Sequence, residues 1–372
     1  MNSQWRELLP QAAAASSSDP DARAAQFAAL QSGSFAALAH DTGLIAVTGA
    51  DAASFLHGQL TNDVEHLKPA QARLTGYCSA KGRLLATFLM WRDATADADA
   101  TIYLAGAADV QAAVQKRLSM FVLRAKAKLS DATATHVLLQ VGGPAAEGVL
   151  SQTFATLPAA PLAAVQGTLG DAPTSLIRLP DAGSARSLPR YLWSVPVTQA
   201  AQVWAALQAA PGLVVVDPDL TAWLDVHSGV ANVVTATQEQ FVPQMVNWEV
   251  VGGVSFRKGC YPGQEVVARS QYRGVIKRRL HLAHVADGSA VPVPAQELVE
   301  VSDPDQPCGM VVQAAAAPSG GYDVLVELKL AAREADDVRL GTAEGPALQF
   351  RAMPYEIFDP TETPAASASA AS

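Results

Sequence analysis

One cysteine with cationic neighbours is the most chemically informative feature of the sequence. Cys260 lies in the segment FRKGCYPGQEVVAR (256–269), next to Arg257 and Lys258 and just ahead of a predicted helix over 264–271. Positive side chains and the N-terminal end of a helix stabilise a thiolate, which is the reactive form of a thiol. We therefore predict that Cys260 is a reactive thiol assisted by Lys258. The alternative is a small buried packing residue.

The residues on either side of the cysteine predict its backbone. Pro262 suits the first position of the helix, where a missing N–H is tolerated. Gly259 and Gly263 permit a positive φ or the close approach of another backbone or a ligand. A cysteine used only for packing would need none of these neighbours.

Several segments together resemble one known family. The motif KGCYPGQEVVAR, followed by QYRG and KRR, resembles the signature of the YgfZ-type folate-binding proteins. The resemblance continues in 241–247 (FVPQMVN), 252–256 (GGVSF), 48–51 (TGAD) and 55–63 (FLHGQLTND), and covers roughly residues 40–355. These proteins are relatives of the glycine-cleavage T-protein, an aminomethyltransferase. The resemblance implies an accessory role in iron–sulfur cluster assembly or repair, with tRNA modification as an indirect consequence.

The resemblance also implies tetrahydrofolate, or a derivative of it, as the cofactor. A folate needs hydrogen bonds for its pterin, apolar walls for its aminobenzoyl group and cations for its carboxylates. Amides suit a pterin edge because they both donate and accept hydrogen bonds. The candidate contacts are Gln244 and Asn247 for the pterin, Tyr261, Trp223 or Trp248 for a wall, and Arg269 for the tail. The alternatives are amides that fix a loop and tryptophans that pack in the core.

One position departs from the T-protein pattern. Those relatives hold the pterin with a Glu in a hydrophobic-Glu-Ala-Gly run, and the matching run here is Val226-His227-Ser228-Gly229. We retain His227 as a candidate folate contact and add Asp225, which lies on the same side as His227 if the segment is a strand. The alternative for His227 is a structural histidine.

A second departure separates the possible activities. The aminomethyltransferases need a carboxylate just past a hairpin glycine, and the run here, GRLLAT (82–87), has Leu85 and Ala86 and no acid. We therefore predict a folate-binding accessory protein, with folate-dependent aminomethyl or one-carbon transfer as the first alternative. The second alternative is a thiol enzyme with Cys260 as nucleophile and His227 or His281 as base.

The number and spacing of the cysteines limit the metal sites that the chain could form. Cys78, Cys260 and Cys308 are far apart and form no CxxC pair and no disulfide framework. Because a stable cluster generally takes about four protein ligands, we predict no stably bound metal, and at most transient iron or cluster contact at Cys260. The expected partners are folate and iron–sulfur client or assembly proteins, in a reducing cytoplasm.

Composition narrows the class of protein. The chain has 372 residues, of which 49% are hydrophobic and 16% charged, so roughly two or three domains are expected. It has no apolar run of about 18 residues and no secretory-signal pattern, so no membrane contact is predicted. The net charge of −9 argues against direct nucleic-acid binding. Residues 257–279 nevertheless carry seven cations and one acid, which form either a solvated face or an anion site.

The predicted elements form an α+β fold with two ferredoxin-like or T-protein-type layers around a central cleft and a small C-terminal β-barrel. In the first layer the order is β-α-β-β-β-α-β, with strands at 44–47, 74–79, 84–91, 101–104 and 121–129. In the second, strands at 136–141, 175–179, 191–195 and 213–216 alternate with helices after Pro144 and Thr198. Six short alternating runs between 276 and 351 predict the barrel.

The predicted divisions of the chain follow from these elements. They are a flexible leader (1–35), a first α+β domain (36–130), a second α+β domain (131–220), a return segment that lines the cleft and carries the cysteine motif (221–274), the β-barrel (275–357) and a disordered tail (358–372).

Overall fold

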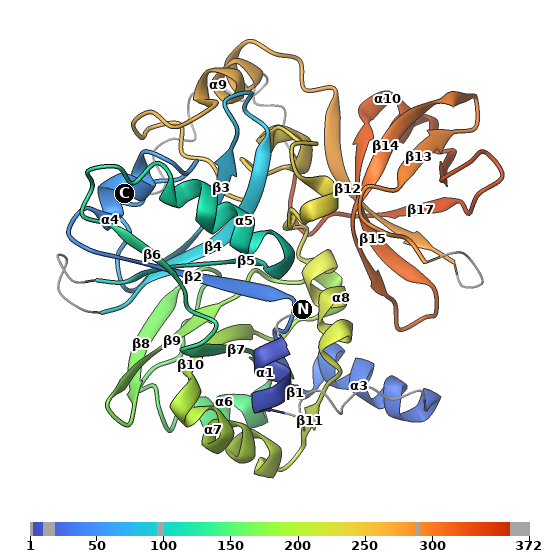
Figure 1. Ribbon diagram of the computed structural model, residues 1–372. Coiled ribbons are helices and arrows are strands. Elements are labelled where there is room, and N and C mark those ends of the chain that lie inside the picture. The colour runs from blue at the N-terminus through green and yellow to red at the C-terminus, as the bar shows by residue number, and fades with distance from the viewer. Residues whose placement is uncertain (1–2, 10–18, 95–99, 287–290, 358–372) are drawn as a thin grey trace.

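The computed structural model describes residues 3–9, 19–94, 100–286 and 291–357. Strands in these ranges form three sheets, flanked by helices (Figure 1). The predicted α+β class is confirmed. Within the same ranges, no helix has the length and apolar character needed to cross a membrane.

The first sheet has five strands in the order β3-β4-β5-β2-β6. Along the chain its elements are β2 (Thr42–Thr48), α4 (Ala52–His57), β3 (Ala72–Cys78), β4 (Leu84–Arg92), β5 (Ile102–Ala107), α5 (Ala108–Ser119) and β6 (Lys128–Asp131). This is the predicted order. Every residue of β4 except Leu89 is buried, because both faces of this strand are covered, which explains its nearly continuous apolar sequence.

The predicted strand over 121–129 is wrong for most of its length. Residues 121–127 form turns, in which Leu123 has a φ of 45°. Its first two apolar residues do not face a core, since Phe121 is 48% and Leu123 is 87% exposed. The segment is held instead at α4, where the Lys126 N–H donates to Asp51 Oδ2 at 2.7 Å.

The second sheet has six strands in the order β11-β1-β7-β10-β9-β8. Its elements are β1 (Ser34–Leu38), β7 (His136–Gly142), α6 (Pro144–Leu150), β8 (Ala164–Leu169), β9 (Ala172–Arg178), β10 (Arg190–Pro196), α7 (Val197–Ala209) and β11 (Leu213–Val215). Helix α7 buries Val203, Trp204 and Leu207 on its inner face. Strand β8 was not predicted, and Pro196 rather than Thr198 is the N-cap residue.

The first 35 residues are not a flexible leader where the structure describes them. Helix α1 (Ser3–Leu8) places Trp5 in the core, and the Trp5 indole N–H donates to Thr133 O at 2.8 Å. Helix α3 (Pro20–Ser32) precedes strand β1. Strand β1 pairs with both β7 and β11. The described part of the leader therefore leads directly into the second sheet.

The third sheet forms the C-terminal domain, on the right in Figure 1. Its strand order is β16-β13-β14-β15-β12-β17. The elements are β12 (Arg278–Val285), β13 (Glu297–Glu300), β14 (Asp303–Ala316), β15 (Tyr322–Lys329), α10 (Leu330–Ala335), β16 (Val338–Leu340) and β17 (Leu348–Arg351). A bridge between Arg339 and Ala347 brings its two edges together, as expected for a small barrel. The predicted disordered tail, 358–372, lies outside the described residues.

Helix α8 (Pro218–His227) lies between the second sheet and the C-terminal domain (Figure 1). Asp217 caps its N-terminus by accepting a hydrogen bond from Asp219 N, and Pro218 occupies the first turn. The prediction of a strand through Asp225 and His227 is therefore wrong. On a helix these two side chains point in different directions.

Candidate functional site

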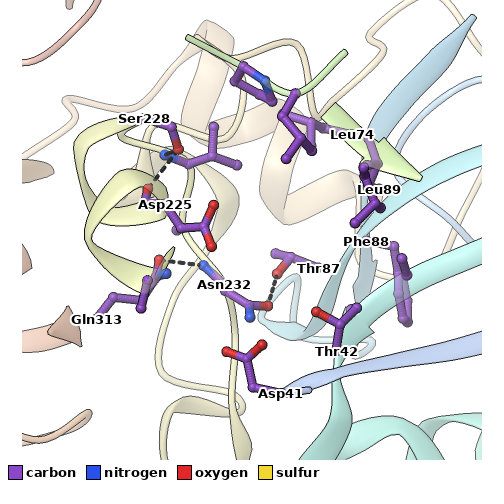
Figure 2. Close-up of a pocket in the computed structure, with 18 of the residues that line it drawn as sticks. Asp41, Thr42, Leu74, Thr87, Phe88, Leu89, Asp225, Ser228, Asn232 and Gln313 are labelled. Carbon is purple, nitrogen blue, oxygen red and sulfur yellow. Dashed lines mark hydrogen bonds between the residues drawn. The ribbon is translucent and has the colours of Figure 1, made fainter. Parts of the chain in front are cut away.

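A cavity lies between the first two sheets and is closed on one side by α8 and the segment after it (Figure 2). The space between protein atoms there is about 880 Å³, a figure that includes open solvent at its mouth. Its walls are largely apolar. They include Leu74, Phe88, Leu89, Leu192 and Trp248.

Asp225 is the best-anchored polar group of the cavity. Its Oδ1 accepts a hydrogen bond from Arg190 Nη1 at 2.5 Å, and its Oδ2 accepts one from Gln140 Nε2 at 3.3 Å. The Arg190 side chain is only 3% exposed, whereas that of Asp225 is 36% exposed. The pair therefore leaves the carboxylate facing the cavity, with its charge partly balanced from behind.

Asn232 is also fixed in place. Its backbone N–H donates to Gln313 Oε1 at 2.8 Å, and its side-chain Oδ1 accepts from the Thr87 hydroxyl at 3.4 Å. Asp41 points toward it from the start of β2 (Figure 2). The charged groups that line the cavity are thus Asp41, Asp225 and Arg190.

The predicted wall residue Trp223 and the predicted pterin contact His227 face away from this cavity. The Trp223 indole N–H donates to Asp323 Oδ2 at 2.8 Å, and His227 Nε2 lies 2.7 Å from the same oxygen. Asp323 is a fully buried residue of β15 that is also contacted by His284 and Arg351. His227 therefore has the structural role that the sequence analysis gave as the alternative. It helps to hold α8 against the C-terminal domain.

The side chains of Gln244 and Asn247 likewise form hydrogen bonds within the protein. Gln244 is 1% exposed and its Nε2 donates to Val267 O at 2.9 Å. Asn247 is fully buried, has a φ of 55°, and its Nδ2 donates to Leu280 O at 3.0 Å. Neither residue lines the cavity. Of the predicted folate contacts, only Asp225 and the wall candidate Trp248 line it.

Lys258 anchors the loop that carries Cys260. Its ammonium group donates to the carbonyls of His57 and Leu60 at the end of α4, and lies 4.8 Å from the centre of the Tyr261 ring. Burial lowers the pKa of Lys258 to about 8, although nearby acidic groups act in the opposite direction. Tyr261 is itself buried. Lys258 and Tyr261 therefore fix the loop, and the Cys260 side chain is left exposed.

Helix α9 (Gln264–Tyr272) begins at the predicted residue, but Pro262 is not its first position. Gly263 is its N-cap with a φ of 79°, so Pro262 lies before the helix. A Cβ at Gly263 would fall 2.4 Å from Ser79 O at the tip of the β3–β4 hairpin. A glycine is required here both for its positive φ and for this close approach.

Cys260 lies near the tip of that hairpin and not at the described cavity. The cavity is lined by Thr87 and Phe88, which lie further along β4. Four residues of extended strand separate Leu84 from Phe88, about 13 Å. No residue from 257 to 263 lines the cavity. The predicted position of the thiol at the edge of the cleft is therefore not supported.

The basic segment divides into two groups. Arg278 pairs with Glu327 at 2.8 Å, and Arg279 pairs with the buried Glu249. The exposed cations are Arg257, Arg269, Arg273 and Lys277. None of them lines the cavity, so the structure does not place Arg269 where it could bind a ligand tail there.

The histidine nearest to the thiol loop is one that sequence reasoning missed. His57 Nδ1 lies 3.1 Å from Asp63 Oδ1, and its Nε2 is 3.6 Å from the position of a Cβ at Gly259. By contrast, His227 is bonded to Asp323 and His281 belongs to β12. Neither of the two bases considered for a thiol enzyme adjoins the loop. The motif FLHGQLTND was visible, but its proximity to Cys260 is a tertiary feature.

We expect a thiol reagent at pH 8 to modify one thiol per native chain rapidly. Cys260 is exposed, whereas Cys78 and Cys308 are buried. Burial raises the pKa of the Cys78 thiol to about 12 and that of Cys308 to about 11. Mass spectrometry after short labelling should find the adduct on Cys260 alone, and Cys260→Ala should remove it. Equally rapid labelling of Cys308 in the folded protein would contradict this placement.

Comparison with known proteins identifies a matching family and relatives that cover most of the chain. Residues 23–211 match the GCVT N-terminal domain family. A tRNA-modifying protein YgfZ from Klebsiella pneumoniae is 31% identical over 322 residues, 86% of this chain and 92% of that one. One from Vibrio vulnificus is 34% identical over 244 residues, 66% and 68% of the two chains. The solved glycine cleavage system aminomethyltransferase T from Bartonella henselae covers 88% of both chains with a TM-score of 0.66 and 18% identity. That likeness shows a shared fold.

Proposed function

This chain belongs to the YgfZ family of proteins with a GCVT N-terminal domain, and from that premise we propose that it binds a reduced folate in the central cavity and serves iron–sulfur cluster assembly or repair. The observation that carries the proposal is the cavity itself, with apolar walls and a small set of fixed polar groups. Leu74, Phe88 and Trp248 suit the aminobenzoyl group. Asp225 and Asn232 suit a heterocycle with several N–H groups.

The cavity favours binding over one-carbon transfer. Leu85 and Ala86, the positions without the transferase carboxylate, are 7% and 0% exposed and do not line the cavity. The one cation that lines it, Arg190, is bonded to Asp225. A folate tail would therefore extend toward the mouth and solvent. We propose an accessory protein that recognises the ring system and leaves the tail largely unbound.

The proposed task of Cys260 is separate from the folate. The thiol is exposed next to α9, beside the exposed Arg257. A single thiol supplies one of the about four ligands that a cluster generally takes, so a client or assembly protein must supply the others. The relatives are named tRNA-modifying proteins. We propose that tRNA modification depends on this chain indirectly, through iron–sulfur enzymes of the cytosol, where its three free cysteines stay reduced.

Tetrahydrofolate should bind saturably to the full chain in calorimetry under anaerobic conditions. Ala222→Phe should weaken that binding at least about tenfold, because Ala222 lies on α8 and lines the cavity, and a phenyl ring there would occupy it. The matched control is Ala112→Phe, at an exposed position of α5 outside the cavity. The proposal fails if the wild-type chain shows no saturable binding, or if both variants bind equally well.

A further inference from the structure

Asp41 is a carboxylate that faces the cavity and receives no hydrogen bond from another residue among those described. It immediately precedes β2, and its side chain is exposed to the cavity (Figure 2). The one protein group that donates to it is its own backbone N–H. Its neighbour His40 is already engaged, with Nε2 3.1 Å from Asp219 Oδ1.

The surroundings of Asp41 penalise its charge. Burial and the negative charge of Asp225 raise the pKa of Asp41, and the charge of His40 opposes them. The side chain is nevertheless open to the water of the cavity. A ligand that donates hydrogen bonds to this carboxylate would stabilise its charge.

A second acceptor oxygen in the same cavity belongs to Gln140. Gln140 is 6% exposed, its Nε2 donates to Asp225, and among the described residues nothing donates to its Oε1. Asp41, Asp225 and Gln140 thus bring acceptor oxygens to one cavity, and its one cation, Arg190, already serves Asp225. With two carboxylates and one guanidinium, the charged part of the lining is net acidic.

These acceptors define a class of ligand. Two carboxylates with one guanidinium repel an anionic group. They favour a flat heterocycle with adjacent N–H donors, such as a 2-amino-pyrimidinone ring, whose amino group and ring N–H can both donate to one carboxylate. The apolar walls formed by Phe88 and Leu192 accommodate its faces.

We propose that Asp41 is the residue that recognises the amino and ring N–H edge of the bound heterocycle, with Asp225 beside it. Asp41 would thereby provide the pterin contact that was predicted at His227, because His227 is buried and bonded to Asp323. This inference rests on the proposed folate binding and adds the residue that selects the ring and the orientation in which it binds. The ring lies at Asp41, and any carboxylate tail lies at the mouth.

The test compares tetrahydrofolate with an analogue that lacks the 2-amino group, by calorimetry on the full chain. Asp41→Asn keeps the shape but removes the charge and one acceptor, so tetrahydrofolate should bind roughly 10- to 100-fold more weakly. Asp171→Asn, at an exposed turn between β8 and β9, is the matched control and should bind as the wild type does. The wild type should prefer tetrahydrofolate over the analogue, and Asp41→Asn should lose most of that preference.

The outcomes separate the inference from the function on which it rests. Failure of tetrahydrofolate to bind the wild type overturns the proposed function. If the wild type binds it and Asp41→Asn binds as tightly as Asp171→Asn, the inference alone is overturned. Should Asp41→Asn misfold by circular dichroism, the comparison of the two ligands on the wild type decides, because equal affinities exclude recognition of the amino group by a carboxylate.

Discussion

Replacing Asp323 with alanine is expected to lower the free energy of unfolding by about 3–5 kcal/mol. Asp323 is fully buried in β15 and accepts hydrogen bonds from side chains on three elements. Its partners are Trp223 and His227 on α8, His284 on β12 and Arg351 on β17. Removing the carboxylate leaves the buried side chains of Trp223, His227 and His284 without this acceptor.

Urea unfolding followed by circular dichroism measures this loss. Asp337→Ala is the matched control, because Asp337 is exposed and its bond to Arg339 is on the surface. We expect the control to change the free energy by less than about 0.5 kcal/mol. Equal unfolding free energies for the two variants would mean that Asp323 does not hold α8 to the C-terminal domain.

The same residue predicts a dependence of stability on pH. Burial alone would raise the pKa of Asp323, but hydrogen bonds from His227, Trp223 and His284 outweigh it and lower the pKa from 3.8 to about 2. The folded chain therefore favours the ionised form more than the unfolded chain does. The stabilisation, roughly 2 kcal/mol, is present above about pH 4 and is lost as the pH falls toward 2. Asp323→Ala should lack this part of the acid sensitivity.

Cys260→Ala is expected to abolish the cellular role while leaving folate binding intact. In a strain that lacks the chromosomal copy, the wild-type chain should restore the activities of several iron–sulfur enzymes. The variant should restore no more than an empty vector does, because it removes the one exposed thiol among the described residues. Tetrahydrofolate affinity should be unchanged, since no residue from 257 to 263 lines the cavity.

Cys308→Ala is the control for the loss of a thiol in general. Cys308 is 2% exposed, within the core of the C-terminal domain, and its replacement should restore enzyme activity as the wild type does. Full restoration by Cys260→Ala would remove the thiol from the account and leave the cavity as the sole functional site. A loss of folate binding in Cys260→Ala would instead show that the two sites are coupled.

The sequence predicted the first layer well because its periodicity is local. The order β-α-β-β-β-α-β follows from apolar runs and turn residues that act over a few positions. The exception, 121–127, shows the limit of such patterns. Its apolar residues alternate as in a strand, but Phe121 and Leu123 meet no partner layer and remain exposed.

Helix α8 was misjudged although its signals were present. Asp217-Pro218 is a typical helix start, and Leu220, Trp223, Leu224 and His227 follow the spacing of one helical face, all of them buried. Treating Asp225 and His227 as strand neighbours put both on one side. On the helix Asp225 faces the cavity and His227 faces Asp323.

That Asp41 and Asp225 line one cavity could be learned only from the structure. Asp225 was predicted as a folate contact on the same side as His227, but Arg190 and Gln140, which hold it, come from two strands of the second sheet. Asp41 belongs to no motif. Only the structure shows that Asp41 lies in the turn before β2 and lines the cavity that α8 closes on one side. Cys260 was identified from its neighbours, but its distance from the cavity depends on how the motif packs on the β3–β4 hairpin.

A crystal structure of the chain with tetrahydrofolate bound tests the account most directly. The account predicts a heterocycle between the wall around Phe88 and helix α8, with its amino and ring N–H groups within hydrogen-bonding distance of Asp41 and Asp225 and its tail at the mouth. A folate bound against Cys260 and α9, with only water between Asp41 and Asp225, would contradict it.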